Sequence, residues 1–229
     1  MTADRAPPSD TCWTVIGHAA RGDGAARETF ARTYLPVVRG YLAARWRMSP
    51  LAQESDDAAQ EVFVDLLRED GALARVDPAR PGGFRAYLFG VTHNVALHFE
   101  TRRARRHGRE SVGTIDADAL PGKDDAPSVV FDREWARGVM RAAAKRQERA
   151  AADDDARRRC ELLRLRFNEA MPIRDIATRW GVDPDALHRE YARARKEFRE
   201  ALRAEVAFHH AGPAADVDAE CARLLSLLR

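Results

Sequence analysis

Cysteine and histidine are the residues of this 229-residue chain most able to do chemistry, and their spacing does not favour it. The three cysteines, Cys12, Cys160 and Cys221, are far apart and form no CxxC pair, so neither a disulfide framework nor a zinc site is predicted. The seven histidines form no HExxH motif and no Cys/His cluster. The loops GxxxxGK(S/T), GxGxxG and GxSxG are also absent. We therefore expect no catalytic residue, no metal and no cofactor, and a protein that is not an enzyme.

The charged residues are unevenly distributed along the chain. The 38 Lys and Arg residues nearly balance the 36 Asp and Glu residues, for a net charge of +2. Residues 49–70 hold seven acids and one base, whereas residues 71–109 hold eight arginines and two acids. Such arginines could bind nucleic-acid phosphates, and such acids could bind a basic protein. Arginines at a helix C-terminus also favour the helix dipole, so a purely structural role stays open.

The elements that position these charges are predicted to be helices. Apolar residues recur at a spacing of three to four between clusters of Gly and Pro, with no alternation of period two, which predicts an all-α fold. Ser55 and Ser128 are expected as N-caps. The expected helices cover residues 11–20, 25–47, 55–68, 84–108 and 128–150.

A helix-turn-helix is predicted at residues 173–191, IRDIATRWGVDPDALHREY. Gly181 can adopt the positive φ of the turn, and Asp183 with Pro184 suits the start of the second helix. The outer face of that helix is either a solvated charged face or, in this motif, a surface that reaches the major groove. The candidate base readers are His188 and Arg189, and the candidate phosphate contacts are Arg193, Arg195 and Lys196.

Two segments together carry a family resemblance. DDAAQEVFVDLL at residues 56–67, followed by FRAYLFGVTHNVALHFETRRARR at residues 84–106, resembles region 2 of bacterial sigma factors of the extracytoplasmic-function type, group IV of the sigma-70 family. Residues 160–202 resemble region 4 of the same proteins. The resemblance implies two small helical domains joined by a flexible acidic linker with no region 3. It also implies a factor that directs core RNA polymerase to promoters and assists their opening.

The resemblance implies three segments. Residues 1–108 correspond to region 2, residues 109–127 to the acidic linker, and residues 128–210 to region 4. Beyond the resemblance, the helical spacing of Val217, Cys221, Leu224, Leu225 and Leu228 predicts a C-terminal amphipathic tail at residues 211–229. Its apolar stripe packs on the protein's own second domain or, as a regulatory alternative, covers a DNA-binding or polymerase-binding surface.

The resemblance also implies a role for individual residues. Melting a promoter requires aromatic and amide groups that hold an unstacked base, and arginines that hold the backbone. The expected contacts with core polymerase are Asp56, Asp57, Gln60, Glu61 and Asp65. The loop at residues 69–83 and the next helix match the part that melts the minus-10 element, with Tyr87, His93, Asn94, Arg102, Arg103, Arg105 and Arg106 as DNA contacts. The expected minus-35 contacts are Asp185, His188, Arg189, Arg193 and Lys196.

The sequence departs from the family pattern in four places. Leu97 and Glu100 stand where a polar or basic residue is common, and Glu190 replaces a frequent arginine. The polar stretch at residues 145–159 is longer than the usual connection in region 4.

Core RNA polymerase and promoter DNA are the expected partners, and the resemblance also admits an anti-sigma factor or a regulatory kinase. No apolar run reaches the 18 to 20 residues, roughly, that cross a bilayer, and the N-terminus has no signal peptide, so we expect a cytoplasmic protein without membrane insertion. The alternative function is a helix-turn-helix regulator that binds DNA without polymerase.

Overall fold

The structure is a computed structural model that describes residues 11–69, 71–78, 82–107, 126–209 and 214–228. Within these residues the regular structure consists of α-helices and two short 3-10 helices, without a strand, so the all-α prediction is confirmed. No helix among them is long and apolar enough to cross a membrane. The predicted linker falls almost entirely on residues outside the described ranges.

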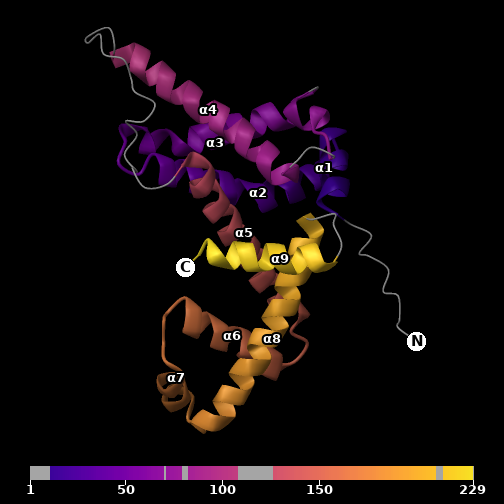
Figure 1. The fold of residues 1–229 in the computed structure, drawn as a ribbon, viewed down its shortest axis with the longest axis vertical. Helices are drawn as coiled ribbons and strands as arrows, with labels where there is room; N and C mark the ends of the chain where they lie inside the picture. Colours follow the sequence, from indigo (N-terminus) through magenta and orange to yellow (C-terminus); the bar gives the residue numbers. More distant parts are fainter. Residues whose placement is uncertain (1–10, 70, 79–81, 108–125, 210–213, 229) are drawn as a thin grey trace. The chain divides into compact units, whose positions relative to one another are not determined.

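The N-terminal helices form a bundle in which each helix packs on the next in the sequence (Figure 1). The predicted starts and ends of these helices are confirmed to within about two residues. The expected loop at residues 69–83 contains a short 3-10 helix, η2, at Ala72–Arg75. The four α-helices are α1 (Cys12–Ala20), α2 (Gly24–Arg45), α3 (Ser55–Leu67) and α4 (Gly83–His107).

Helix α2 shows why the predicted pattern produces this bundle. Asp23 caps the helix, because its side chain accepts a hydrogen bond from the backbone N–H of Ala26 at 2.7 Å. The helix continues through Pro36. Its apolar stripe is buried, as expected from helical spacing, at Phe30, Tyr34, Val37, Val38, Tyr41 and Leu42.

The two predicted serine N-caps are wrong. A 3-10 helix, η1 (Pro50–Glu54), runs directly into α3, so Glu54 occupies the N-cap position and Ser55 is already helical. The Ser55 hydroxyl instead donates to the carbonyl oxygen of Ala52 at 2.8 Å. Helix α5 begins at Pro127, one residue before Ser128. Proline is favourable in a first helical turn, because its missing N–H has no partner to lose there.

The C-terminal helices are α5 (Pro127–Ala150), α6 (Asp154–Phe167), α7 (Ile173–Trp180), α8 (Pro184–His209) and α9 (Ala214–Ser226). The described chain divides into two compact units. We call the first the N-terminal unit; it contains the described residues up to Gly138 together with 208–209 and 223–228. The second, the C-terminal unit, contains 139–207 and 214–222. The functional boundaries predicted at residues 108, 127 and 210 stay a prediction.

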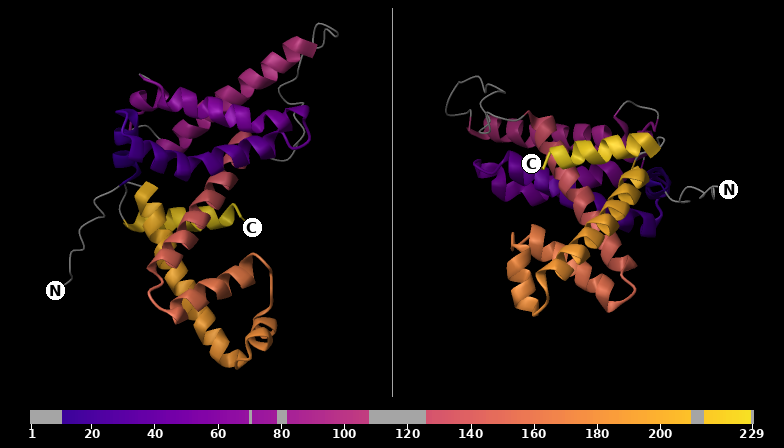
Figure 2. Two further views of the ribbon diagram at one scale, coloured as in Figure 1. Left: turned by 180° about the vertical axis from the view of Figure 1, so that it is seen from behind. Right: turned by 60° about the horizontal axis from the view of Figure 1, so that its bottom comes forward.

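The first part of α5 packs closely on α2 within the N-terminal unit. Phe131 is fully buried, with its ring centroid 5.5 Å from that of Tyr41. Gly138 permits the close approach, because a Cβ atom there would lie 2.7 Å from Cγ2 of Val37. Figure 2 shows α2, α3 and α4 from two further sides.

The segment predicted as a helix-turn-helix lies within the C-terminal unit. Helices α7 and α8 are joined by a turn in which Gly181 has φ +64° and ψ 38°, as expected. The carboxylate of Asp183 accepts a hydrogen bond from the N–H of Ala186 at 2.9 Å, so the predicted N-cap is confirmed. A buried cluster holds the two helices against α6, formed by Leu162, Leu165, Ile173, Ile176, Ala177 and Leu187.

The C-terminal helix α9 buries part of its predicted apolar stripe. Val217, Cys221 and Leu224 are buried, whereas Leu225 is 41% exposed and Leu228 is half-buried. Within the N-terminal unit, a guanidinium nitrogen of Arg223 lies 3.3 Å from a carboxylate oxygen of Asp132. An inhibitory role for the tail stays a prediction.

Candidate protein and nucleic-acid interfaces

Helix α3 presents an acidic face, defined as Asp56, Asp57, Gln60, Glu61 and Asp65. The opposite side of the helix is anchored in the bundle by Ala58, Ala59, Val62 and Leu66, all buried. The face itself is exposed except for Asp65, which is half-buried. Two of its acids form ion pairs: Asp56 lies 2.9 Å from Arg39 and Asp65 lies 3.9 Å from Arg68. The acidic face holds two further acids besides these pairs, on a helix anchored in the bundle, which suits a basic protein surface.

Val64 lies beside the acidic face and was not among the predicted contact residues. Its side chain is 64% exposed, one turn beyond Gln60 and Glu61 on the same helix. An exposed apolar residue among charges is a common feature of protein interfaces. Its helical spacing from Gln60 would have identified it.

Helix α4 is buried along its first part and carries exposed arginines near its end. Phe84, Leu88, Val95 and Phe99 are buried, and Val91 is half-buried. Arg102 and Arg106 follow Phe99 by three and seven residues, so they continue the same helical stripe towards the end of the helix. Asn94, Arg102, Arg105 and Arg106 are exposed, and Arg103 is half-buried with its guanidinium 4.0 Å from the carboxylate of Glu54.

An open hollow lies beside the acidic face, where α3 and α4 run side by side (Figures 1 and 2). We call it the arginine hollow; it is lined by Glu61, His98, Thr101, Arg102, Arg105 and Arg106. His98 and Thr101 were not among the predicted DNA contacts, although both follow Asn94 at helical spacing.

Tyr87 and His93 lie apart from the exposed arginines, in contacts within the bundle. The Tyr87 hydroxyl donates to the backbone carbonyl of Ala72 in η2, which ties α4 to the loop at residues 69–83. Nδ1 of His93 lies 3.2 Å from the hydroxyl of Tyr41 and 3.5 Å from Nη1 of Arg45. Burial and the positive charge of Arg45 lower the pKa of His93, with a smaller opposing effect from Glu100.

Glu100, one of the departures from the family pattern, is a structural anchor. Its carboxylate accepts hydrogen bonds from Nε and Nη2 of Arg45 and from the indole N–H of Trp46. A basic residue at this position would place two cations together inside the bundle. The other departure on α4, Leu97, is 40% exposed.

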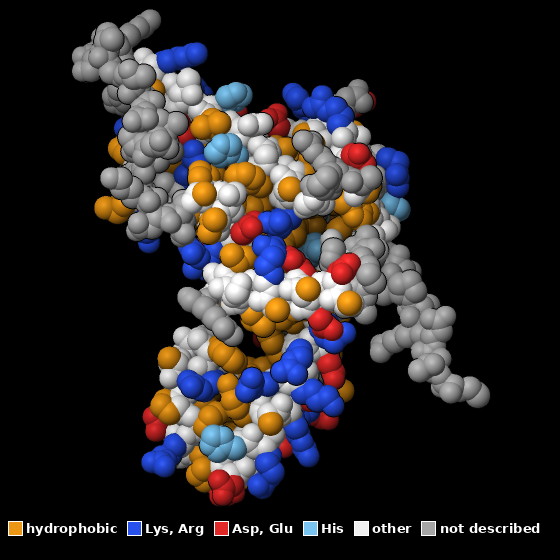
Figure 3. Space-filling model, viewed as in Figure 1, with side chains coloured by type: hydrophobic (Ala, Val, Ile, Leu, Met, Phe, Trp, Pro, Cys, Tyr) orange, Lys and Arg blue, Asp and Glu red, His pale blue; other side chains and the backbone are white. Residues whose placement is uncertain are grey.

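The first turns of α8 carry the predicted minus-35 contacts on one exposed side. Asp185, His188, Arg189, Arg193 and Lys196 are all exposed. The opposite side is buried at Leu187 and Ala194. In Figure 3, basic side chains are interleaved with acidic ones along the part of the surface that Figure 1 labels α8.

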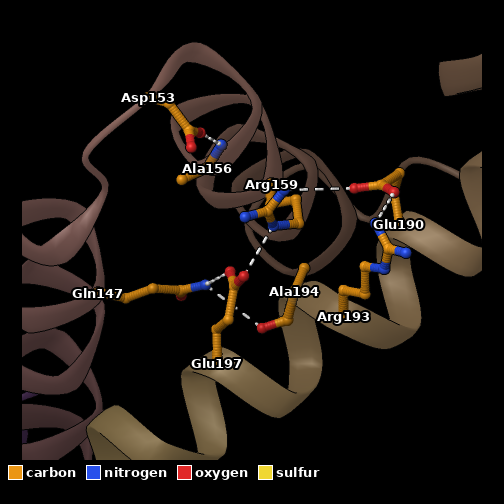
Figure 4. A network of polar contacts seen from close by, with 8 residues as sticks. All are labelled: Gln147, Asp153, Ala156, Arg159, Glu190, Arg193, Ala194 and Glu197. Carbon is orange, nitrogen blue, oxygen red and sulfur yellow. Dashed lines mark hydrogen bonds and ion pairs between the residues drawn. The ribbon is translucent and has the colours of Figure 1, made fainter.

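A polar network fixes the position of α8 in the C-terminal unit (Figure 4). Arg159 on α6 donates to Glu197 at 2.8 Å and to Glu190 at 3.4 Å. The buried Gln147 on α5 donates to the carbonyl oxygen of Ala194 at 3.3 Å. The long polar stretch at residues 145–159 therefore supplies the groups that fasten α8. Glu190 is part of this network and also accepts a hydrogen bond from Arg193 at 3.1 Å.

The cysteines show no arrangement for chemistry. Cys12, Cys160 and Cys221 are free thiols, and burial raises the pKa of Cys12 to about 12, which suppresses its reactive thiolate. Within the described ranges, no three His, Cys, Asp or Glu residues are grouped to hold a metal ion.

Part of the chain matches a known protein family. Residues 30–107 match the family model of sigma-70 region 2, a segment that runs from Phe30 on α2 to the last residue of α4. This segment covers about a third of the chain and contains both the acidic face and the arginine hollow. No curated protein matches the sequence significantly. The match supports a sigma factor of the sigma-70 family, with a role in promoter recognition and transcription initiation.

Proposed function

We propose that this chain is a sigma factor of the extracytoplasmic-function type, which binds core RNA polymerase in the cytoplasm and directs it to a two-part promoter. The observation that carries the proposal is the match of residues 30–107 to sigma-70 region 2, on a bundle that exposes acids on one helix and arginines on the next. The polymerase performs the catalysis, so the chain itself carries out no reaction on a substrate.

The acidic face is the proposed contact with core polymerase. Asp57, Gln60 and Glu61 are exposed on a helix whose other side is buried. Because the buried side anchors that helix in the bundle, its backbone is already ordered before binding, and only the side chains must lose conformational freedom. Asp56 and Asp65 belong to the same contact, and Val64 adds an apolar centre.

The exposed residues in the second half of α4 are the proposed contact with the minus-10 element. Its exposed arginines suit phosphates, and Asn94 offers an amide to a base. Tyr87 and His93 act from the bundle side in this proposal: Tyr87 holds the loop at residues 69–83, and His93 joins α4 to α2. Tyr87 and His93 then contact a base only if these hydrogen bonds open.

The minus-35 element is the proposed target of α7 and α8 as a helix-turn-helix. The exposed residues at the start of α8, Asp185, His188 and Arg189, are those that reach base edges when such a helix enters the major groove. Arg193 and Lys196, further along, suit phosphates. An anti-sigma factor or regulatory kinase stays a predicted partner.

Core-polymerase binding tests the proposal. We expect the full chain to co-purify with a bacterial core polymerase and to start transcription from a subset of a promoter library. Asp57→Arg combined with Glu61→Arg should abolish binding without loss of helical content by circular dichroism.

The matched control for the double reversal is Glu28→Arg combined with Glu148→Arg, which changes the net charge equally at exposed sites outside the acidic face. If this control loses binding equally, net charge rather than the acidic face is responsible. DNA binding by the wild-type chain without any polymerase binding would favour the alternative regulator instead.

A further inference from the structure

The arginine hollow places one member of the acidic face among the proposed DNA contacts. Glu61 projects from α3, and Arg102, Arg105 and Arg106 project from α4 into the same open space. Among the described residues that line the hollow, Glu61 is the one acid. Arg103, between these arginines in sequence, pairs instead with Glu54.

We propose that Glu61 is an electrostatic gate for nucleic acid in the arginine hollow. In the free chain its carboxylate offsets part of the arginine charge and repels an incoming phosphate. A basic polymerase residue docked on Glu61 cancels this repulsion and raises the affinity of the hollow for DNA. The gate rests on the proposed function, because it needs both a basic protein partner and a phosphate-bearing strand.

The size of the effect follows from exposure and screening. The Debye length is about 8 Å at physiological ionic strength, so charges that line one hollow still interact. Glu61 and the three arginines are exposed, which limits the interaction to the range of exposed charge pairs. Removal of the Glu61 charge should therefore strengthen DNA binding by about 2- to 5-fold.

Thermodynamic linkage makes the gate reciprocal. If polymerase raises the affinity for DNA by a given factor, DNA must raise the affinity for polymerase by the same factor. Part of this coupling would then reside in Glu61, which faces both partners. The remaining acids of the face contribute to polymerase binding without lining the hollow.

The first test uses the full chain without polymerase and a fluorescent single-stranded DNA oligonucleotide at about 50 mM salt, where phosphate contacts are strong. Glu61→Gln should bind the oligonucleotide about 2- to 5-fold more tightly than the wild-type chain. Glu28→Gln removes the same charge from an exposed site outside the hollow and should leave the affinity unchanged. At about 1 M salt, where the Debye length is about 3 Å, the advantage of Glu61→Gln should disappear.

The second test measures the affinity for core polymerase with and without the oligonucleotide. The wild-type chain should bind polymerase more tightly when DNA is present, and Glu61→Gln should show a smaller ratio between the two conditions. Equal ratios in the two proteins would overturn the gate.

The outcomes separate the gate from the proposed function. The gate alone is overturned if the wild-type chain binds both partners and Glu61→Gln binds DNA no more tightly than the wild-type chain does. The same conclusion follows if Glu61→Gln and Glu28→Gln bind DNA with equal affinity. A wild-type chain that binds neither DNA nor polymerase overturns both proposals.

Discussion

Glu100 and Arg45 form a two-point ion pair inside the N-terminal bundle, with Nε 2.6 Å from one carboxylate oxygen and Nη2 2.9 Å from the other. The Arg45 side chain is 6% exposed and that of Glu100 is 15% exposed. These low exposures mean that the pair is shielded from water, unlike the exposed Glu28–Arg32 pair of the same unit. The pair joins α2 to α4 across 55 residues of sequence.

Glu100→Gln should lower the free energy of unfolding by about 3 kcal/mol, because it leaves a buried guanidinium without a counter-charge. Chemical denaturation followed by circular dichroism measures this change. The control is Glu28→Gln, which breaks an exposed pair with Arg32 and should cost less than about 1 kcal/mol. Equal losses in the two variants would show that the buried pair is no stronger than a surface one.

Gly138 and Gly90 should respond oppositely to alanine. Gly138→Ala should lower the free energy of unfolding by about 1 to 3 kcal/mol, because the new methyl group would meet Val37. Gly90→Ala should raise it by about 0.5 to 1 kcal/mol, because a Cβ there has no neighbouring group within 4 Å and alanine favours a helix. Urea titrations of both variants test the close packing of α5 on α2. Stabilisation by Gly138→Ala would contradict it.

The stability of the N-terminal unit should fall with acid because of His209. Its Nδ1 lies 3.4 Å from the Tyr34 hydroxyl, its ring packs edge-on to Trp135, and burial lowers its pKa to about 4. The same group titrates near pH 6.5 in an unfolded chain. Between about pH 6.5 and pH 4 the unfolded state therefore binds a proton that the folded state excludes, so stability decreases as the pH falls through this window.

The loss attributable to His209 should reach up to about 3 kcal/mol at the acid end of the window. Denaturant titrations at several pH values measure the slope. His209→Gln should show a flatter dependence on pH than the wild-type chain. The same slope in His209→Gln and the wild-type chain would assign the acid sensitivity to other groups.

Arg189→Ala should weaken binding to the minus-35 element by about 1 to 3 kcal/mol and relax the preference at one base pair, if Arg189 reads a base. Binding to a library of duplexes, read by sequencing, separates base readout from phosphate contact. Arg193→Ala provides the comparison, because a phosphate contact should weaken all sequences about equally. A uniform loss for Arg189→Ala would reassign it to the phosphates.

Local signals in the sequence predicted local structure well. Asp183 and Gly181 act within a few residues of their own positions, and both were predicted correctly. The prediction of Ser55 as an N-cap was wrong because η1 continues into α3, and no residue next to Ser55 indicates a 3-10 helix before it. For α9, helical spacing identified Val217, Cys221 and Leu224, whereas the exposed Leu225 marks the edge of its stripe.

Contacts between distant segments were not predictable from patterns. The partners of Glu100 lie 54 and 55 residues away, so the sequence showed only an acid where a basic residue is usual. The inward position of His93 depends in the same way on Tyr41 and Arg45. Helical spacing could have added His98 and Thr101 to the candidate site, but their proximity to Glu61 required the packing of α3 on α4.

Asp132 binds two arginines at once, Arg85 through one carboxylate oxygen and Arg223 through the other. Arg223 follows Asp132 by 91 residues, so the ribosome adds it about 5 to 18 s later at the usual rates of synthesis. The N-terminal unit also includes Leu224, which is almost fully buried. A nascent chain therefore cannot complete this unit until residue 223 has been synthesised, and a chain that ends before Arg223 has an N-terminal unit without these contacts.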